Sequence, residues 1–168
     1  MNKLLATAGA IAVLALTSTA AQAVTPATQA TATAKIFKPL TIASTQNLDF
    51  GTIVLSGATF TGESVNMDLS GTVTCGTTAG DLTCSGAPKP ATYHLAGTAN
   101  AVVTITSPGF NLANGAATLP FAPNFNGTVT LDSTGVADIS LGGKITGLAN
   151  TTVDGVYTGT FAVTADYQ

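Results

Sequence analysis

Strict alternation of apolar and polar residues near the C-terminus constrains the fold of this chain more than any other feature. Tyr157, Phe161, Val163 and Tyr167 occupy odd-numbered positions on one face, and threonine and aspartate occupy much of the other. A period of two is typical of a β-strand with one buried and one solvent-exposed face. An Asp-Gly pair at residues 154–155 marks the turn before it. The pattern predicts one C-terminal strand over residues 155–168, and we expect the protein to end on it.

Similar alternation recurs along the chain, with glycine, proline and asparagine turn signals between the runs. About eight to ten short strands at this spacing are typical of an all-β sandwich. Because the strands alternate rather than being apolar on both faces, we expect antiparallel sheets packed face to face. Residues 110–125, with two prolines and an Asn-Gly pair, look irregular. The predicted strands before the C-terminal one are 30–36, 40–42, 48–50, 65–75, 91–95, 101–106, 127–131, 136–141 and 144–148.

The first 23 residues have the pattern of an export signal. A short basic start is followed by an apolar run at residues 4–16, and Ala21 and Ala23 are the small residues that a signal peptidase requires before Val24. The run is shorter than the roughly 20 residues of a membrane-spanning helix, so we expect no stable membrane span. The sequence predicts cleavage after Ala23 and one exported domain at residues 24–168.

Composition excludes one class of partner. Only 8% of the residues are charged, and the five basic residues are all lysines, four of which, Lys35, Lys38, Lys89 and Lys144, follow the signal. A nucleic-acid-binding surface needs clustered positive charge, so no nucleic-acid partner is expected.

The two cysteines, Cys75 and Cys84, are predicted to form a structural disulfide. An exported chain meets an oxidising compartment, where disulfides form and persist. The pair would close a short local loop. Two cysteines with one distant histidine make a poor metal site, so no metal is predicted.

No catalytic constellation can be assembled from the sequence. His94 is the only histidine, and alternation places it on the solvent face of its strand. No Gly-x-Ser-x-Gly elbow is present, and the eight acidic residues are scattered. We therefore predict no enzyme activity and no cofactor. The sequons that begin at Asn126 and Asn150 are interpreted as a turn and a loop.

Three stretches carry a family resemblance. Residues 32–42 with 48–53, then 91–108 and 155–167, resemble the family called domain of unknown function 4402, which consists of small exported proteins of Gram-negative bacteria. The alternating end with a penultimate tyrosine, Tyr167, is also similar to chaperone–usher fimbrial subunits and spore-coat-U-like pilins. The resemblance implies an immunoglobulin-like Greek-key sandwich that lacks one strand, which the N-terminal extension of the next subunit supplies.

The residues that would supply that strand here are Ala30, Ala32, Ala34 and Ile36, although the same residues could instead form the first strand of their own sandwich. We therefore expect a structural envelope protein, a fimbria-like or pilus-like subunit that acts through β-strand contacts. Like subunits and a periplasmic chaperone are its expected partners, and the periplasm, cell surface or fimbria is its expected location. The alternative is a surface adhesin or carbohydrate-binding module that does not polymerise, with a site on a loop such as residues 110–125.

Overall fold

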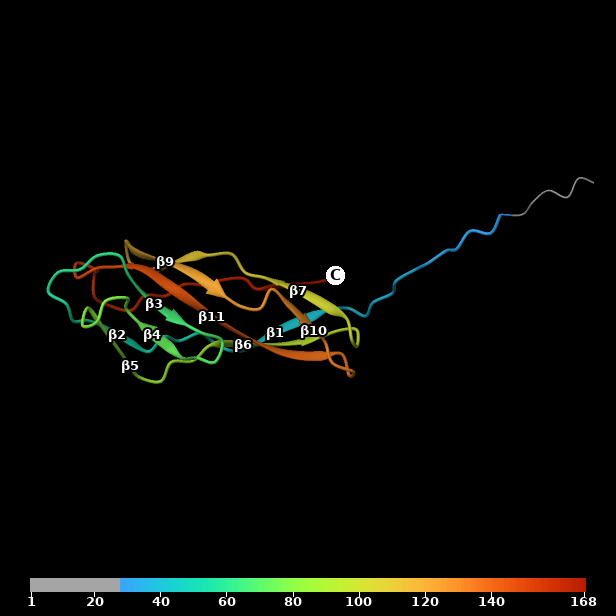
Figure 1. Ribbon diagram of the computed structural model, residues 1–168, viewed down its shortest axis with the longest axis horizontal. Helices are drawn as coiled ribbons and strands as arrows, with labels where there is room; N and C mark the ends of the chain where they lie inside the picture. Colours follow the sequence, from blue (N-terminus) through green and yellow to red (C-terminus); the bar gives the residue numbers. More distant parts are fainter. Residues whose placement is uncertain (1–27) are drawn as a thin grey trace, which may run out of the picture. The chain divides into compact units, whose positions relative to one another are not determined.

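The computed structural model describes residues 28–168, so the predicted cleavage residues Ala21, Ala23 and Val24 lie outside the described part. Residues 28–168 form twelve strands and contain no helix (Figure 1). The strands are β1 (Thr41–Gln46), β2 (Thr52–Leu55), β3 (Glu63–Met67), β4 (Val73–Cys75), β5 (Leu82–Ser85), β6 (Ala91–Ala96), β7 (Val102–Thr106), β8 (Phe110–Asn114), β9 (Ala117–Asn124), β10 (Thr128–Thr130), β11 (Val136–Leu148) and β12 (Thr164–Tyr167).

The strands build three sheets, and every strand pair is antiparallel. The largest sheet has the order β1-β6-β11-β3-β4, with β9 paired to β11 and β8 to β9. A second sheet has the order β10-β7-β12, and β2 pairs with β5 in the third. The all-β, antiparallel prediction is confirmed, whereas the immunoglobulin-like Greek-key order stays a prediction.

Strand β11 crosses two parts of the largest sheet. Residues 136–141 pair with β6, and the strand then continues between β3 and β9. Gly142 and Gly143 lie at this crossing, where a Cβ on Gly142 would clash with the Met67 carbonyl oxygen and a Cβ on Gly143 would clash with the Phe121 ring. The glycine pair that looked like a turn signal therefore lies inside a strand, where close packing requires small residues.

Two clusters of buried side chains form the core. The second core cluster receives residues from β6 and β7 and partly buried residues from β1, β11, β10 and β12, so the first two sheets pack face to face there. The first core cluster gathers residues of β3, β5, β9 and β11. Its buried members are Phe60, Val65, Leu82, Leu119, Phe121, Ile145 and Leu148, and those of the second cluster are Leu95, Val103, Ile105 and Leu131.

The predicted C-terminal strand is shorter than expected. Its strand ladder covers only Thr164–Tyr167, and residues 156–163 make a single isolated bridge, from Thr158 to Ala113. Burial nevertheless alternates as predicted, because Phe161, Val163 and Tyr167 are half-buried between exposed neighbours. The alternation reports which side chains face the core and not whether the backbone has a neighbouring strand.

Two other predictions about strands were wrong. Residues 30–36 belong to no strand, and the first strand begins at Thr41, so the described structure does not contain the expected first strand. The long run at 65–75 is a hairpin, because residues 68–72 turn the chain from β3 to β4. In that turn the Asp68 carboxylate accepts hydrogen bonds from the backbone N–H groups of Ser70 and Thr72, at 2.9 and 2.8 Å.

Residues 110–125, expected to be irregular, mostly form the β8–β9 hairpin. Its two-residue turn is Gly115 and Ala116, and Gly115 at the first position has φ of 59°, in the left-handed region that favours glycine there. Pro120 and Pro123 both lie within β9. The Asn-Gly signal was present in the sequence and was the correct hairpin indicator, while the prolines pointed away from a strand.

Candidate functional site

A large hollow lies over the first core cluster. It has a volume of about 1130 Å³ and is lined by two segments from opposite ends of the domain sequence, residues 44–55 and 152–163. We call it the apolar groove. Its other lining residues come mainly from the β8–β9 hairpin and β11, including Phe110, Leu112, Leu119, Phe121, Ile145 and Leu148.

The backbone along the groove includes strand edges without a neighbour. Strand β1 ends the path of the largest sheet, and β2 belongs to a two-stranded sheet in which β5 is its partner. Between residues 156 and 163, only Thr158 is bridged, by two hydrogen bonds of 2.7 and 3.0 Å with Ala113. Such edges present N–H and C=O groups in a row and are templates for an added strand.

Exposed apolar side chains gather at the same place. Of the five large exposed hydrophobic residues that the described chain contains, Val54, Val153 and Val156 line the groove, at 47%, 54% and 79% exposure. Exposed apolar residues that cluster beside a hollow indicate a surface that another molecule covers. The remaining two are Ile36 and Val102.

Aromatic rings form much of the groove surface. The rings of Phe110 and Phe161 stack with centroids 5.2 Å apart, and Phe121 lies 4.9 Å from Phe110 and 6.0 Å from Phe50. Gly159 passes directly over this stack, because a Cβ there would lie 2.5 Å from a Phe110 ring carbon. The groove is therefore suited to apolar side chains.

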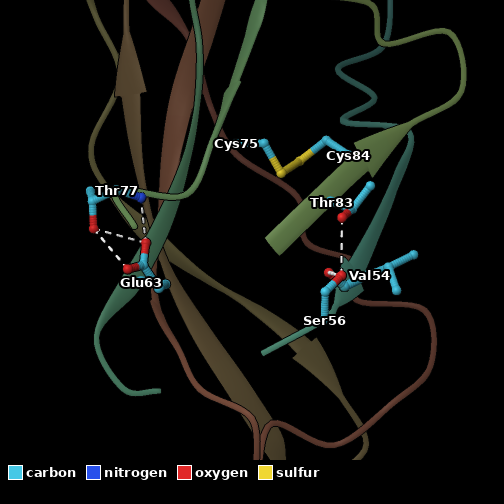
Figure 2. Close-up of a disulfide and its surroundings, with 7 residues drawn as sticks. All are labelled: Val54, Ser56, Glu63, Cys75, Thr77, Thr83 and Cys84. Atoms are coloured by element: carbon cyan, nitrogen blue, oxygen red, sulfur yellow. Dashed lines mark hydrogen bonds between the residues drawn. A yellow bond between two sulfur atoms is a disulfide. The ribbon is translucent and has the colours of Figure 1, made fainter. Parts of the chain in front are cut away.

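The predicted disulfide is present and supports one side of the groove. Cys75, at the end of β4, is bonded to Cys84 in β5 (Figure 2). Strand β5 pairs with β2, whose residues Thr52–Leu55 line the groove. The disulfide thus ties the small β2–β5 sheet to the edge of the largest sheet.

The loop between β4 and β5 is held by a buried carboxylate. Glu63, only 4% exposed, points at Thr77 (Figure 2) and accepts hydrogen bonds from its hydroxyl group at 2.8 Å and from its backbone N–H. The Thr78 N–H donates a third bond, at 3.2 Å. These hydrogen bonds, led by that from the Thr77 backbone, lower the pKa of Glu63 to about 2, so the carboxylate is charged at neutral pH.

The other residues singled out from the sequence are not brought together. His94 lies on the exposed face of β6, as predicted, and its Nδ1 is 2.7 Å from Oδ1 of Asp138 on β11. No group of three or more metal-ligating side chains occurs within residues 28–168. Asn126 and Asn150 are both exposed, and the Asn150 side chain donates a hydrogen bond to the Ala58 carbonyl oxygen. The same residues contain no helix of membrane-spanning length and hydrophobicity.

The family with the description "domain of unknown function (DUF4402)" matches residues 40–167, a region that contains all twelve strands. The chain belongs to the DUF4402 family. The predicted membership is confirmed. No curated protein matches the chain, and no solved structure does.

Sequence reasoning placed strands beside the groove of this DUF4402 domain but missed the groove itself. Its lining at residues 44–55 and 152–156 was interpreted only as short strands and turns. One signal was available: Val153 and Val156 flank the Asp-Gly turn at residues 154–155, where polar residues are usual. That signal alone could not show which distant segment lies beside them.

Proposed function

We propose that this protein is an exported structural subunit of the bacterial cell envelope, fimbria-like, which joins like subunits by accepting a β-strand in the apolar groove. One observation carries the proposal: the groove is lined by residues of the edge strands β1 and β2 and by the largely unpaired backbone of residues 156–163, and it is bordered by exposed valines. An added strand would pair with the backbone of an edge and bury the apolar lining, which is recognition by β-augmentation. A structural role, without catalysis or a cofactor, accords with the chemistry of the lining.

The strand we assign to the groove is residues 30–36 of a second copy. Ala30, Ala32, Ala34 and Ile36 alternate with polar residues, and Ile36 is 87% exposed. Seven residues in a strand extend about 23 Å, at roughly 3.3 Å per residue. The three alanines would lie against the phenylalanine rings of the lining, and Ile36 supplies the one large apolar side chain.

The geometry of this contact sets the form of the assembly. The donor segment and the accepting groove are different surfaces of one chain, so each copy can give a strand to one neighbour and receive one from another. Contacts of this head-to-tail kind build open filaments when the rotation does not close a ring. We also propose that a periplasmic chaperone occupies the groove before assembly, since an apolar hollow with free edges invites unwanted pairing. The disulfide supports an oxidising location such as the periplasm or cell surface.

The test is a binding measurement between a donor peptide and a chain that cannot donate. The acceptor is the chain without its predicted signal carrying Ala32→Asp and Ala34→Asp, and the probe is a fluorescent peptide of residues 24–38. We expect saturable binding, and an acceptor that also carries Val156→Lys should bind the peptide at least about tenfold more weakly, because a strand in the groove would bury the added ammonium without a partner.

The matched control is Val102→Lys, since Val102 is an exposed valine on the outer face of β7 and does not line the groove. It should leave the affinity for the peptide unchanged. Absence of peptide binding, or equal weakening by the two lysine variants, would refute strand acceptance in the groove. If strand acceptance is refuted in this way, electron microscopy should show no difference in fibre formation between the unmodified chain and the Ala32→Asp, Ala34→Asp variant.

A further inference from the structure

The last strand of the domain contacts the residues that directly precede the first strand. The Tyr167 hydroxyl group donates a hydrogen bond to the Lys38 carbonyl oxygen at 2.9 Å and accepts one from the Thr98 N–H at 2.7 Å. The Tyr167 ring stacks on Phe37, with centroids 4.3 Å apart and an interplanar angle of 9°. One side chain at the end of β12 therefore contacts two consecutive residues that precede β1.

The surrounding residues are shaped for these contacts. The Lys38 N–H donates to the Thr98 hydroxyl oxygen at 2.6 Å, so the same turn between β6 and β7 binds both Lys38 and Tyr167. Gly97 precedes Thr98, and a Cβ at that position would collide with the Tyr167 hydroxyl oxygen. We call these residues, Phe37, Lys38, Gly97, Thr98 and Tyr167, the tyrosine clamp.

The clamp joins the two chain segments that line the groove. From Lys38 the chain runs into β1 and on through residues 44–55, one lining segment. Residues 152–163, the other lining segment, run directly into β12 and end at the clamp with Tyr167. Both segments therefore reach the point where the N-terminal donor segment leaves the domain.

We propose that the tyrosine clamp is a mechanical joint, which shares tension on the N-terminal segment between the two segments that line the groove. This inference rests on the proposed function, because a neighbouring copy that holds residues 30–36 is the source of the tension. Without the Tyr167 hydroxyl, the hydrogen bond that couples Lys38 to the end of β12 is lost, and more of a pull passes along the covalent chain into β1. Strand β1 is an edge strand paired only with β6, so it would peel away one residue pair at a time.

The experiment is single-molecule pulling of the unmodified chain, without its predicted signal, from its two ends at constant force. Tyr167→Phe keeps the ring and removes the hydroxyl. We expect the first opening event to become roughly tenfold to thirtyfold faster under force, because two hydrogen bonds at the clamp are lost. Thr98→Ala, which removes the oxygen that accepts from Lys38, should accelerate the same event and serves as a second variant if Tyr167→Phe folds poorly.

Two controls separate a mechanical role from general stability. Tyr157→Phe removes a hydroxyl that donates a local hydrogen bond, to the Val153 carbonyl oxygen, and should leave the first event unchanged. Ile145→Val lowers stability from within the first core cluster, distant in sequence from the clamp. The opening rate of each variant under force is divided by the loss in its free energy of unfolding, measured by urea unfolding. We expect the scaled rate to be higher for Tyr167→Phe than for Ile145→Val.

Scaled opening rates that coincide for Tyr167→Phe and Ile145→Val, or an opening rate that Tyr167→Phe leaves unchanged, would overturn the proposal. The peptide-binding assay remains a separate measurement, and Tyr167→Phe should bind the donor peptide normally when no force is applied. If the unmodified groove binds no peptide, strand acceptance fails while the pulling result still decides whether the clamp resists tension.

Discussion

Removal of the Cys75–Cys84 disulfide should weaken both the domain and the groove. The double variant Cys75→Ala, Cys84→Ala frees β5 from β4, and β5 carries β2 with it through the ladder from Thr52–Ser85 to Leu55–Leu82. Ser56 adds a hydroxyl hydrogen bond of 3.0 Å to Thr83 across the same small sheet (Figure 2). The β2–β5 sheet should therefore stay paired within itself while its attachment to the largest sheet loosens.

The size of the stability loss follows from the length of the closed loop. The two cysteines are separated by nine residues in sequence. The chain-entropy relation for a loop of that length gives about 2.6 kcal/mol at 25 °C. With a urea dependence of about 1–3 kcal/mol per molar, the unfolding midpoint should fall by roughly 0.9–2.6 M.

Two assays measure the two effects. Urea unfolding followed by circular dichroism gives the stability of the oxidised protein, the reduced protein and the double variant, and the last two should agree. The fluorescent donor peptide gives groove affinity below the unfolding transition, where we expect about a tenfold loss, because binding must then order the β2 side of the groove.

A double variant as stable as the oxidised protein would refute the assignment of a structural role to the disulfide. If the double variant loses the expected stability but binds the peptide with unchanged affinity, the argument that the disulfide positions β2 beside the groove would be refuted. If the double variant loses peptide affinity but keeps its stability, the disulfide shapes the groove without stabilising the fold.

Two further predictions concern Glu63 and the glycines. The pKa of Glu63 is lowered from 4.5 to about 2, so its carboxylate stabilises the fold above pH 4.5, and this contribution should disappear as pH falls toward 2. Urea unfolding at several pH values should show a smaller loss over that range for Glu63→Gln than for the unmodified protein, and equal slopes would contradict the prediction. Gly142→Ala should cost about 1–3 kcal/mol, since its Cβ would meet the backbone carbonyl oxygens of Met67 and Asp68. Gly127→Ala, with no atom within 4 Å of its Cβ, should change stability by less than about 0.5 kcal/mol, and similar costs at both sites would refute the packing argument.

Local patterns in the sequence predicted the class of fold and several particular features. Alternation at residues 161–167 predicted which side chains are half-buried, and a pair of cysteines in a chain with an export signal predicted the disulfide. The polar position of His94 predicted its exposed place on a strand. These succeed because side-chain direction along an extended chain depends only on neighbouring residues, with a period of two.

The tertiary structure alone decided which segments meet. The same alternation occurs at residues 30–36 and at residues 161–167. The first segment lies in no strand, whereas the second packs its apolar side chains against the core. The groove needs residues 44–55 and 152–163 at one place, and the clamp needs Tyr167 beside Lys38, 129 residues away in sequence. Which strands pair and which edges stay unpaired depends on long-range packing. Alternation with a period of two shows the face on which a side chain lies, but it does not identify the neighbouring strand.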